Sequence, residues 1–424
     1  MNDFIFNADL LEYHNSWYFS IDSRDQREYL LKKKRGLLQR HFNAHRLSKS
    51  IELNNLQDAK QHISHPRLTS LLKYQNDEIS LNPSRLLREN EPVLNALREI
   101  NPQEWKVIFR TSDTYRVILE KGLKGKKNHF THYSILVKIR LKDHRQFIEI
   151  GEGSVTSPKF NQSGLSQRIK KIVENHIHSK PVRFTGKIPV ILNAGDGAII
   201  FHELLGHSLE ADYICQHQSP LSIDDIGKQI MSKNITITTH DDADSFFKGI
   251  TCDDEGHSPE SHILVEKGIL RHVISDYFYM NRLNIKDSGH SRLEDFTKKP
   301  MPRMFALYVK PGEYHPDELI ASTKYGVYAL EFGEGKVNFE KNLFYFHIRE
   351  AWIIKDGKLS EPLGSIIVKG NILDVLKSVE MVANDFRYDK GISYCFKNGQ
   401  TLNVRVGQPT VKINNLYVTR EFGF

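Results

Sequence analysis

The chain has 424 residues, 39% of them hydrophobic and 26% charged, and a formal net charge of +7 at pH 7. This is the composition of an ordinary globular protein with enough apolar residues for a large core, and the length favours two domains. No run approaches the roughly 20 apolar residues that a membrane-spanning helix needs, so a membrane partner is not expected.

The N-terminus and the cysteines predict a cytoplasmic protein. Residues 1–7 have neither a basic start nor an apolar core long enough for a signal peptide. Cys215, Cys252 and Cys395 are too few and too scattered for a disulfide framework. In a reducing compartment a lone cysteine is free to bind a metal, and we therefore expect a cytoplasmic location.

The first hundred residues are predicted to be mainly helical. Capping residues near Asp22 precede a charged helical pattern that runs to residue 46. A second helix is expected over residues 51–74, broken at Pro66, and a third over residues 83–100. Nothing in this region carries recognisable chemistry.

From Trp105 onward the pattern changes to strands. β-Branched and aromatic runs predict an antiparallel meander over residues 105–110, 115–120, 133–140 and 147–153, followed by an amphipathic helix over residues 165–178. We place a domain boundary near residue 180. It separates an N-terminal domain of helices and antiparallel strands (1–180) from a C-terminal domain (181–424).

The C-terminal domain is predicted to be rich in short strands. Turns are expected at residues 266–268, 334–335 and 355–357, and one helix over residues 372–383. Short strands at regular spacing around one embedded helix favour a closed or strongly curved sheet. The predicted fold class is therefore α+β, with a curved or barrel-like sheet in the C-terminal domain.

The embedded helix carries the residues with recognisable chemistry. A short buried strand over residues 188–192 leads into a turn in which Asp196 is placed to cap the helix. The helix then presents His202, Glu203 and His207 in an apolar frame. Imidazole nitrogens bind zinc well, and a glutamate beside a ligand can take a proton from water at the metal. The motif predicts zinc-dependent hydrolysis.

The spacing of the two histidines requires a local distortion of the helix. They are five residues apart, which places them about 140° apart around an ideal helix, whereas a spacing of four leaves about 40°. They reach one ion only if the helix is locally widened, for example by a π-bulge, or ends between them. Gly206 lies where this distortion is needed, and glycine tolerates such backbone geometry.

Residue chemistry alone leaves the third ligand open. A hydrolytic zinc usually has three protein ligands and one water. Glu210 lies close by on the same helix, and Cys395 lies far along the chain in a glycine-flanked loop. Either side chain is an acceptable ligand.

Several motifs in one order resemble the TldD/PmbA metalloproteases, also called modulators of DNA gyrase. The His-Glu-x-x-x-His helix followed by Glu210 and Asp212 is similar to that of the catalytic subunits. Residues 252–259 resemble the family's Asp-Asp-Glu-Gly-Thr-Pro segment. Further matches lie within residues 266–270, 364–371, 384–385 and 395–409. The resemblance covers roughly residues 185–410, whereas the first hundred residues differ from the family.

The resemblance implies a site and a substrate class. Zinc is expected on His202, His207 and Cys395, with Glu203 as the general base. Unfolded or leader-type peptides are expected to bind in extended form, as an added strand. The family also implies a dimer, either a homodimer or a heterodimer with a TldE/PmbA-like paralogue, and this chain resembles the active subunit. It departs from the family at Phe396, where a glycine usually follows the cysteine.

Other features suggest alternatives to a peptidase. Basic residues gather at positions 32–35 and between Lys121 and Arg145, as in a nucleic-acid-associated protein, although such clusters are more often solvated faces. A non-catalytic partner subunit is a further alternative, and the intact metal motif argues against it.

Acidic residues near the motif are candidates for shaping the substrate cleft or binding a second cation. They are Glu210, Asp212, Asp253, Asp254 and Glu255. A further acidic loop over residues 240–244 is predicted to be a solvated turn.

Overall fold

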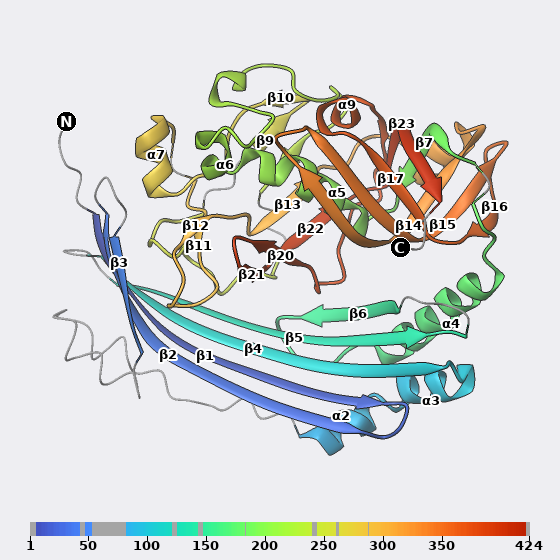
Figure 1. Ribbon diagram of the computed structural model, residues 1–424, viewed down its shortest axis with the longest axis horizontal. Helices are drawn as coiled ribbons and strands as arrows, with labels where there is room; N and C mark the ends of the chain where they lie inside the picture. The colour runs from blue at the N-terminus through green and yellow to red at the C-terminus, as the bar shows by residue number, and fades with distance from the viewer. Residues whose placement is uncertain are drawn as a thin grey trace.

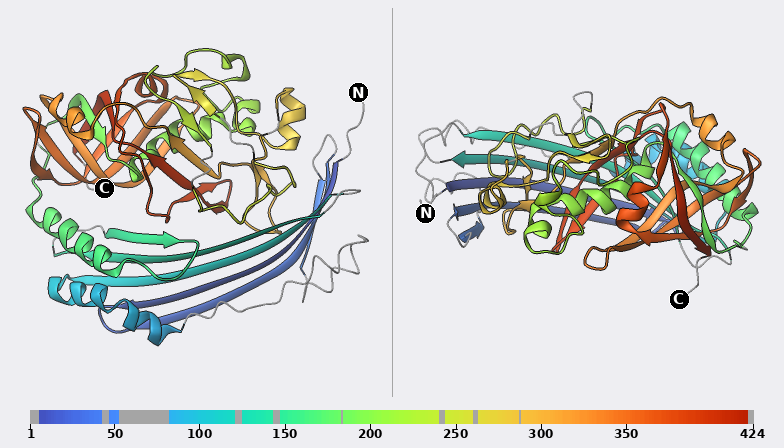
Figure 2. Two further views of the ribbon diagram at one scale, coloured as in Figure 1. Left: turned by 180° about the vertical axis from the view of Figure 1, so that it is seen from behind. Right: turned by 90° about the horizontal axis from the view of Figure 1, so that it is seen from above.

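A long curved sheet and a β-rich body make up the protein, which is described by a computed structural model (Figure 1). The structure describes residues 6–42, 47–52, 82–120, 125–142, 147–182, 184–239, 244–259, 263–286 and 288–420. The body, formed by the C-terminal part of the chain, lies over the concave face of the sheet, as Figure 2 shows from two further sides. The domain boundary near residue 180 stays a prediction.

The curved sheet is antiparallel, with the strand order β3-β2-β1-β4-β5-β6. Its strands are β1 (Phe6–Asp22), β2 (Arg27–Phe42), β3 (Leu47–Glu52), β4 (Glu104–Glu120), β5 (Lys126–Arg140) and β6 (Ile148–Ser154). One face carries Trp17, Phe109 and Val137, which share a buried apolar cluster with the helices α2 (Pro83–Glu89), α3 (Glu91–Ile100) and α4 (Gln162–His178). The opposite face points toward the body and carries His14, Arg116 and Asn128.

The helix predicted over residues 22–46 is wrong. Strand β2 pairs with β1 along its length, from Ile21 opposite Arg27 to Phe6 opposite Phe42. The leucines, lysines and arginines of β2 favour a helix, but helix propensity is a weak preference that tertiary contacts override. Most of the helix predicted over residues 51–74 lies outside the described residues. The helix predicted over residues 83–100 is present as α2 and α3, which meet at Asn90.

The predicted amphipathic helix is confirmed, and so is the antiparallel meander, except that it has three strands where four are predicted. The segments 105–110 and 115–120 belong to one long strand, β4, because the residues between them also pair with β1 and β5. The helix expected over residues 165–178 is α4. Its buried side chains Leu165, Ile169 and Ile172 recur at helical spacing.

The centre of the body is a closed, barrel-like sheet, as the sequence predicts. In the described part of the chain, the strands β14, β7, β23, β17 and β15 pair in that order, and β15 pairs again with β14 to close a five-stranded barrel. These strands are β7 (Gly186–Leu192), β14 (Tyr325–Asn338), β15 (Leu343–Lys355), β17 (Ile366–Asn371) and β23 (Val411–Arg420), with β16 (Lys358–Leu363) and β18 (Val379–Val382) at the margins.

Two local predictions in the body are wrong. The helix expected over residues 372–383 ends early, since α9 (Ile372–Lys377) is followed by β18, whose Val379 and Val382 are buried where it pairs with β23. The turn expected at residues 334–335 lies inside β14, where the pairing with β15 shifts register, and the chain reverses only after Asn338. The turns at residues 266–268 and 355–357 are present.

A second sheet and two hairpins lie beside the barrel. The sheet has the order β10-β9-β8-β13-β22-β19. Its strands are β8 (Ile237–Thr238), β9 (Ile263–Glu266), β10 (Ile269–Leu270), β13 (Ala306–Val309), β19 (Arg387–Tyr388) and β22 (Arg405–Gln408), and the hairpins are β11 (Ser291–Arg292) with β12 (Met301–Pro302) and β20 (Tyr394–Lys397) with β21 (Gln400–Asn403).

The body also contains short helical segments, some of which follow one another within its core. These are η2 (Asp196–Ala198), α5 (Ile199–Phe201), η3 (His202–Gly206), η4 (His207–Leu209), α6 (Ala211–Cys215), η5 (Ile223–Asp225), α7 (Tyr277–Leu283) and α8 (Pro316–Ala321). Phe201 and Leu205 share one buried apolar cluster with the barrel residues Leu192 and Phe346. The core therefore fixes the segment that carries the histidines. Among the described helices, none has the length and hydropathy to cross a membrane.

Candidate metal centre

The turn between β7 and the histidine helix is built on a glycine rather than on an aspartate cap. Gly195 precedes the first helical turn with φ +86°, and a Cβ there would lie 2.7 Å from the Tyr388 carbonyl oxygen. The predicted cap by Asp196 is wrong, because its side chain instead accepts a hydrogen bond from the Lys390 amide at 3.1 Å. The turn is thus hydrogen-bonded to the loop between β19 and β20.

A π-helical turn brings the two histidines onto one side of the helix. In η3 the His207 amide donates to the His202 carbonyl oxygen, a bond across five residues. This confirms the local widening that the five-residue spacing requires. The two imidazole centroids lie 4.9 Å apart. Gly206 ends the turn, where a Cβ would lie 2.1 Å from the Met304 sulfur atom.

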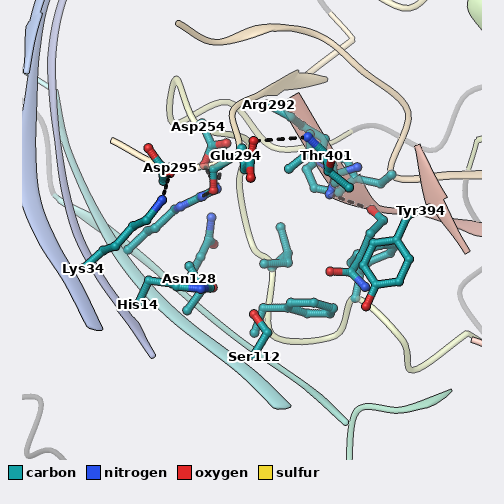
Figure 3. A pocket seen from close by; sticks show the side chains of 18 of the residues that line it. His14, Lys34, Ser112, Asn128, Asp254, Arg292, Glu294, Asp295, Tyr394 and Thr401 are labelled. Atoms are coloured by element: carbon teal, nitrogen blue, oxygen red, sulfur yellow. Dashed lines mark hydrogen bonds and ion pairs between the residues drawn. The ribbon is translucent and has the colours of Figure 1, made fainter. Parts of the chain in front are cut away.

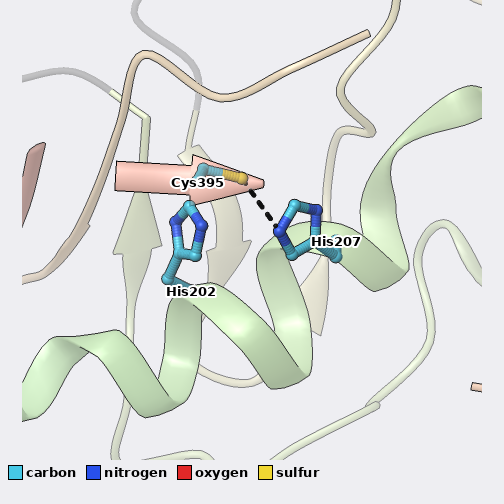
Figure 4. A group of neighbouring side chains, drawn as sticks. All are labelled: His202, His207 and Cys395. Atoms are coloured by element: carbon cyan, nitrogen blue, oxygen red, sulfur yellow. Dashed lines mark hydrogen bonds between the residues drawn. The ribbon is translucent and has the colours of Figure 1, made fainter. Parts of the chain in front are cut away.

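Cys395 reaches the histidines from the hairpin β20–β21 (Figure 4). Side chains of β20 alternate, so that Cys395 is buried while Tyr394 and Phe396 are exposed. The Cys395 Sγ lies 3.1 Å from the His207 Nε2. One ligand atom from each of His202, His207 and Cys395 lies within 4.8 Å of the others. Zinc bond lengths of about 2.0–2.1 Å to nitrogen and about 2.3 Å to sulfur give separations of about 3.5 Å, so the group fits one ion.

The burial of His202 and its lack of hydrogen-bond partners in the described part of the chain also fit a metal ligand. Its side chain is fully buried, yet neither ring nitrogen has a hydrogen-bond partner among the described residues. A buried polar atom without a partner is costly, and bonding to a metal removes that cost. Glu203 is next in sequence with 31% of its side chain exposed, and its Oε2 lies 4.0 Å from the His207 Nε2. Solvent therefore reaches the side of the group where Glu203 lies.

Electrostatics favour a thiolate at Cys395. Burial alone raises the pKa of this thiol, but the neighbouring imidazoles, His207 above all, bring the pKa well below its usual value. Burial alone lowers the pKa of His207, whereas the charges of Cys395 and Glu210 bring that pKa well above its usual value. A thiolate is the form of cysteine that binds metal.

Glu210 lies on the other side of the His207 ring from Cys395. Its Oε2 is 2.7 Å from the His207 Nδ1 and also accepts from the Lys397 ammonium at 2.7 Å. Burial raises the pKa of Glu210, but the charges of His207 and Lys397 outweigh this and lower it. Asp212 lies beside it and accepts from Lys397 at 2.7 Å. Of the two residues left open by the sequence, geometry favours Cys395 as the third ligand.

The other acidic candidates occupy a different part of the body. Asp254 forms a double hydrogen bond at 2.9 Å with Arg116 and lines a cavity of about 270 Å³ between the sheet and the body (Figure 3). Asp253 accepts from three backbone amides, those of Glu255, His257 and Ser291. Glu255 accepts from the Tyr277 amide. Each of these carboxylates thus has structural hydrogen-bond partners, and a role in the substrate cleft or in binding a second cation stays a prediction.

In the two basic clusters predicted from the sequence, several of the described residues form ion pairs with acidic side chains. Lys34 pairs with Asp295, Lys138 with Glu149, and Arg140 with Glu104. Such pairing reduces the charge available to phosphates. Of the acidic loop over residues 240–244, only Asp244 lies within the described residues, and it is hydrogen-bonded to the Tyr308 hydroxyl.

Two buried cations beside the candidate ligands, Lys397 and Arg303, were not predicted from the sequence. Lys397 follows Cys395 by two residues on β20 and therefore shares its inward face. Arg303 is fully buried and donates to the Cys395 carbonyl oxygen at 2.6 Å. The alternation of β20 could have revealed Lys397, whereas nothing in the sequence around Arg303 indicates its position.

Comparison with known proteins places these features in a family. A family model described as the PmbA/TldA metallopeptidase C-terminal domain matches residues 185–420. A Metalloprotease TldD homolog of Buchnera aphidicola is 32% identical over 295 residues, which cover 66% of this chain and 61% of the relative. A Zinc metalloprotease TldD homolog of Saccharolobus solfataricus is 30% identical over 251 residues, which cover 59% of this chain and 55% of the relative.

The fold is also similar to that of a solved structure. The crystal structure of TldE from Thermococcus kodakarensis has a TM-score of 0.72 and 13% identity, and the match covers 98% of this chain and 97% of that one. The family model spans the closed barrel, the histidine helix and Cys395. The chain therefore belongs to the TldD/PmbA family, and the resemblance drawn from its motifs is confirmed. It spans 61% and 55% of the lengths of the two relatives named above.

Proposed function

We propose that this chain is a zinc-dependent peptidase. The observation that carries the proposal is the convergence of His202, His207 and Cys395 within 4.8 Å, beside the partly exposed Glu203. Two imidazoles and a thiolate are typical ligands of zinc, and three protein ligands leave a position for water or substrate. The names of the TldD relatives, one of which specifies zinc, support the same assignment.

The residues of the site have separate proposed roles in metal binding, proton transfer and ligand orientation. His202, His207 and Cys395 would hold zinc, which when bound acts as a Lewis acid on water and on the scissile carbonyl. Glu203 would act as the general base, which accepts a proton from the attacking water and passes it to the leaving amine. Glu210 holds the Nδ1 side of His207, which leaves Nε2 for the metal.

The substrate and the assembly are proposed from the family resemblance. We expect unfolded or leader-type peptides, bound in extended form with main-chain hydrogen bonds. We expect a dimer, either of two copies of this chain or of this chain with a TldE/PmbA-like paralogue, and the fold that it shares with TldE is consistent with both. A cytoplasmic location stays a prediction from the sequence.

Replacement of Glu203 by glutamine tests the mechanism. The variant should keep about one zinc per chain, since the ligands are unchanged, and should lose cleavage of fluorescently labelled casein, an unfolded substrate, by about 100-fold or more. Glu174→Gln, on an exposed position of α4, is the matched control and should cleave as the wild type does. Cleavage by Glu203→Gln at the wild-type rate would refute the proposed general base.

A further inference from the structure

A chain of buried charged groups lies behind the His207 imidazole. The His207 Nδ1 lies 2.7 Å from the Glu210 Oε2, and the same oxygen accepts from the Lys397 ammonium at 2.7 Å. Lys397 also donates to the Asp212 Oδ1 at 2.7 Å. The four side chains therefore form one continuous series, Asp212, Lys397, Glu210 and His207, that ends at the candidate metal group.

The Lys397 ammonium has a hydrogen-bond acceptor for each of its protons. Its side chain is completely buried, and its third contact is the Pro302 carbonyl oxygen at 3.2 Å. The ring of Tyr213 lies 4.3 Å from the ammonium nitrogen. A lysine ammonium has three protons to donate, and the three oxygen atoms accept all of them. The ammonium is therefore fixed in place without any contact with solvent.

This arrangement determines how Glu210 meets His207. One carboxylate oxygen is shared between the imidazole and the ammonium, so the position of Lys397 sets the position of that oxygen. A metal-binding histidine is commonly oriented by a carboxylate on its other ring nitrogen. Without the ammonium, Glu210 and Asp212 would be two neighbouring buried carboxylates without a shared cation, which is costly. The charge of Arg303 also lowers the pKa of Glu210, but the described hydrogen bond of Arg303 goes to the Cys395 carbonyl oxygen and not to Glu210.

We infer that Lys397 is a positioning residue of the candidate metal centre. It holds Glu210 in place, so that His207 presents Nε2 to the metal. The inference rests on the proposed function. Two residues on the inward face of β20 would then serve the metal site. Cys395 would supply one ligand, and Lys397 would orient a second ligand, His207, through Glu210.

Zinc affinity of the full chain tests this inference, measured by competition with a chromophoric chelator. Lys397→Met should bind zinc about 10–100-fold more weakly than the wild type, the range typical for loss of a group that orients a ligand. Lys412→Met is the matched control. Lys412 is also buried and paired, with Glu380 and Ser322, and makes its described contacts away from the candidate ligands. Its replacement should leave zinc affinity unchanged, whatever it does to stability.

A double-mutant cycle separates positioning from general destabilisation. If Lys397 acts through Glu210, then Lys397→Met should weaken zinc binding no further in a Glu210→Gln background. Comparison of Glu210→Gln with the double variant gives this result even where Lys397→Met alone does not fold. The inference would be overturned if Lys397→Met bound zinc as tightly as the wild type. It would also be overturned if the double variant bound zinc more weakly than Glu210→Gln by the full effect of Lys397→Met. Neither result would contradict the proposed function. A wild-type chain that takes up no zinc would overturn the proposed function and the inference together.

Discussion

Cys395 and His207 meet across 188 positions of sequence, and the alternation of one short strand makes that meeting possible. Because successive side chains of β20 point to opposite sides, Cys395 faces the histidines while Phe396 is 73% exposed. Phe396, at the position where the family resemblance predicts a glycine, therefore needs no space within the candidate metal centre. Its φ also lies outside the positive range, so the backbone at this position requires no glycine.

Replacement of Cys395 by serine should reduce or abolish zinc binding. A serine hydroxyl is a far weaker zinc ligand than a thiolate, so we expect the affinity to fall by at least about 10-fold. Elemental analysis of the purified protein, together with chelator competition, measures this effect. Cys215→Ser provides the control, since Cys215 lies outside the candidate group and contacts Arg282. Undiminished zinc binding in Cys395→Ser would favour Glu210 as the third ligand.

At the level of secondary structure, the π-helical turn η3 is the feature that makes a five-residue histidine spacing useful. The turn ends at Gly206, which packs against Met304 and Leu307 of the core. A side chain at this position would have to displace the Met304 sulfur, which lies 2.1 Å from the place of a Cβ. Core packing and metal geometry therefore depend on the same residue.

Gly206→Ala should destabilise the protein by about 1–3 kcal/mol, the usual cost of overpacking a core, and should also weaken zinc binding because the turn orients both histidines. Thermal unfolding and chelator competition measure the two effects. Gly364→Ala serves as the comparison, since the nearest heavy atom to a Cβ there is 3.6 Å away. Equal stability and equal zinc affinity of Gly206→Ala and the wild type would show that the turn tolerates a side chain.

At the scale of the whole molecule, Arg116 of β4 links the curved sheet to the body. It bonds to Glu12 of β1 at 2.8 Å and to Asp254 of the body at 2.9 Å, and it also donates to the carbonyl oxygens of Leu293 and Glu294. Glu12 is completely buried. Burial outweighs the attraction of Arg116 and raises the pKa of Glu12 from 4.5 to about 7.

The raised pKa of Glu12 predicts that the contribution of this residue to stability falls as pH rises. Between about pH 4.5 and about pH 7 the folded state keeps the proton that the unfolded state has lost, so stability decreases across this window. The difference between the two pKa values corresponds to a loss of about 3 kcal/mol. Glu12→Gln should remove this dependence, because the amide cannot ionise.

Unfolding midpoints of the wild type and Glu12→Gln at about pH 5 and about pH 8 measure this contribution. The variant should gain stability relative to the wild type at the higher pH. Glu28→Gln, an exposed position of β2 that pairs with Lys106, should show the pH dependence of the wild type. A constant difference between wild type and Glu12→Gln at both values would contradict the assignment.

The sequence by itself determined the features that depend on neighbouring residues. The histidine spacing required a widened helix, the short strands with their turns indicated a curved sheet, and the alternation from Trp105 onward indicated the meander. Each of these depends on side-chain periodicity within one segment, which the sequence records directly.

Tertiary structure decided what depends on distant partners. Residues 27–42 are a strand because they pair with β1, although their composition favours a helix. Cys395 rather than Glu210 completes the candidate ligand group because Glu210 lies on the opposite nitrogen of His207 and bonds to Lys397. Strand pairing and burial bring together groups that are far apart in the sequence, and local propensity carries little information about such contacts.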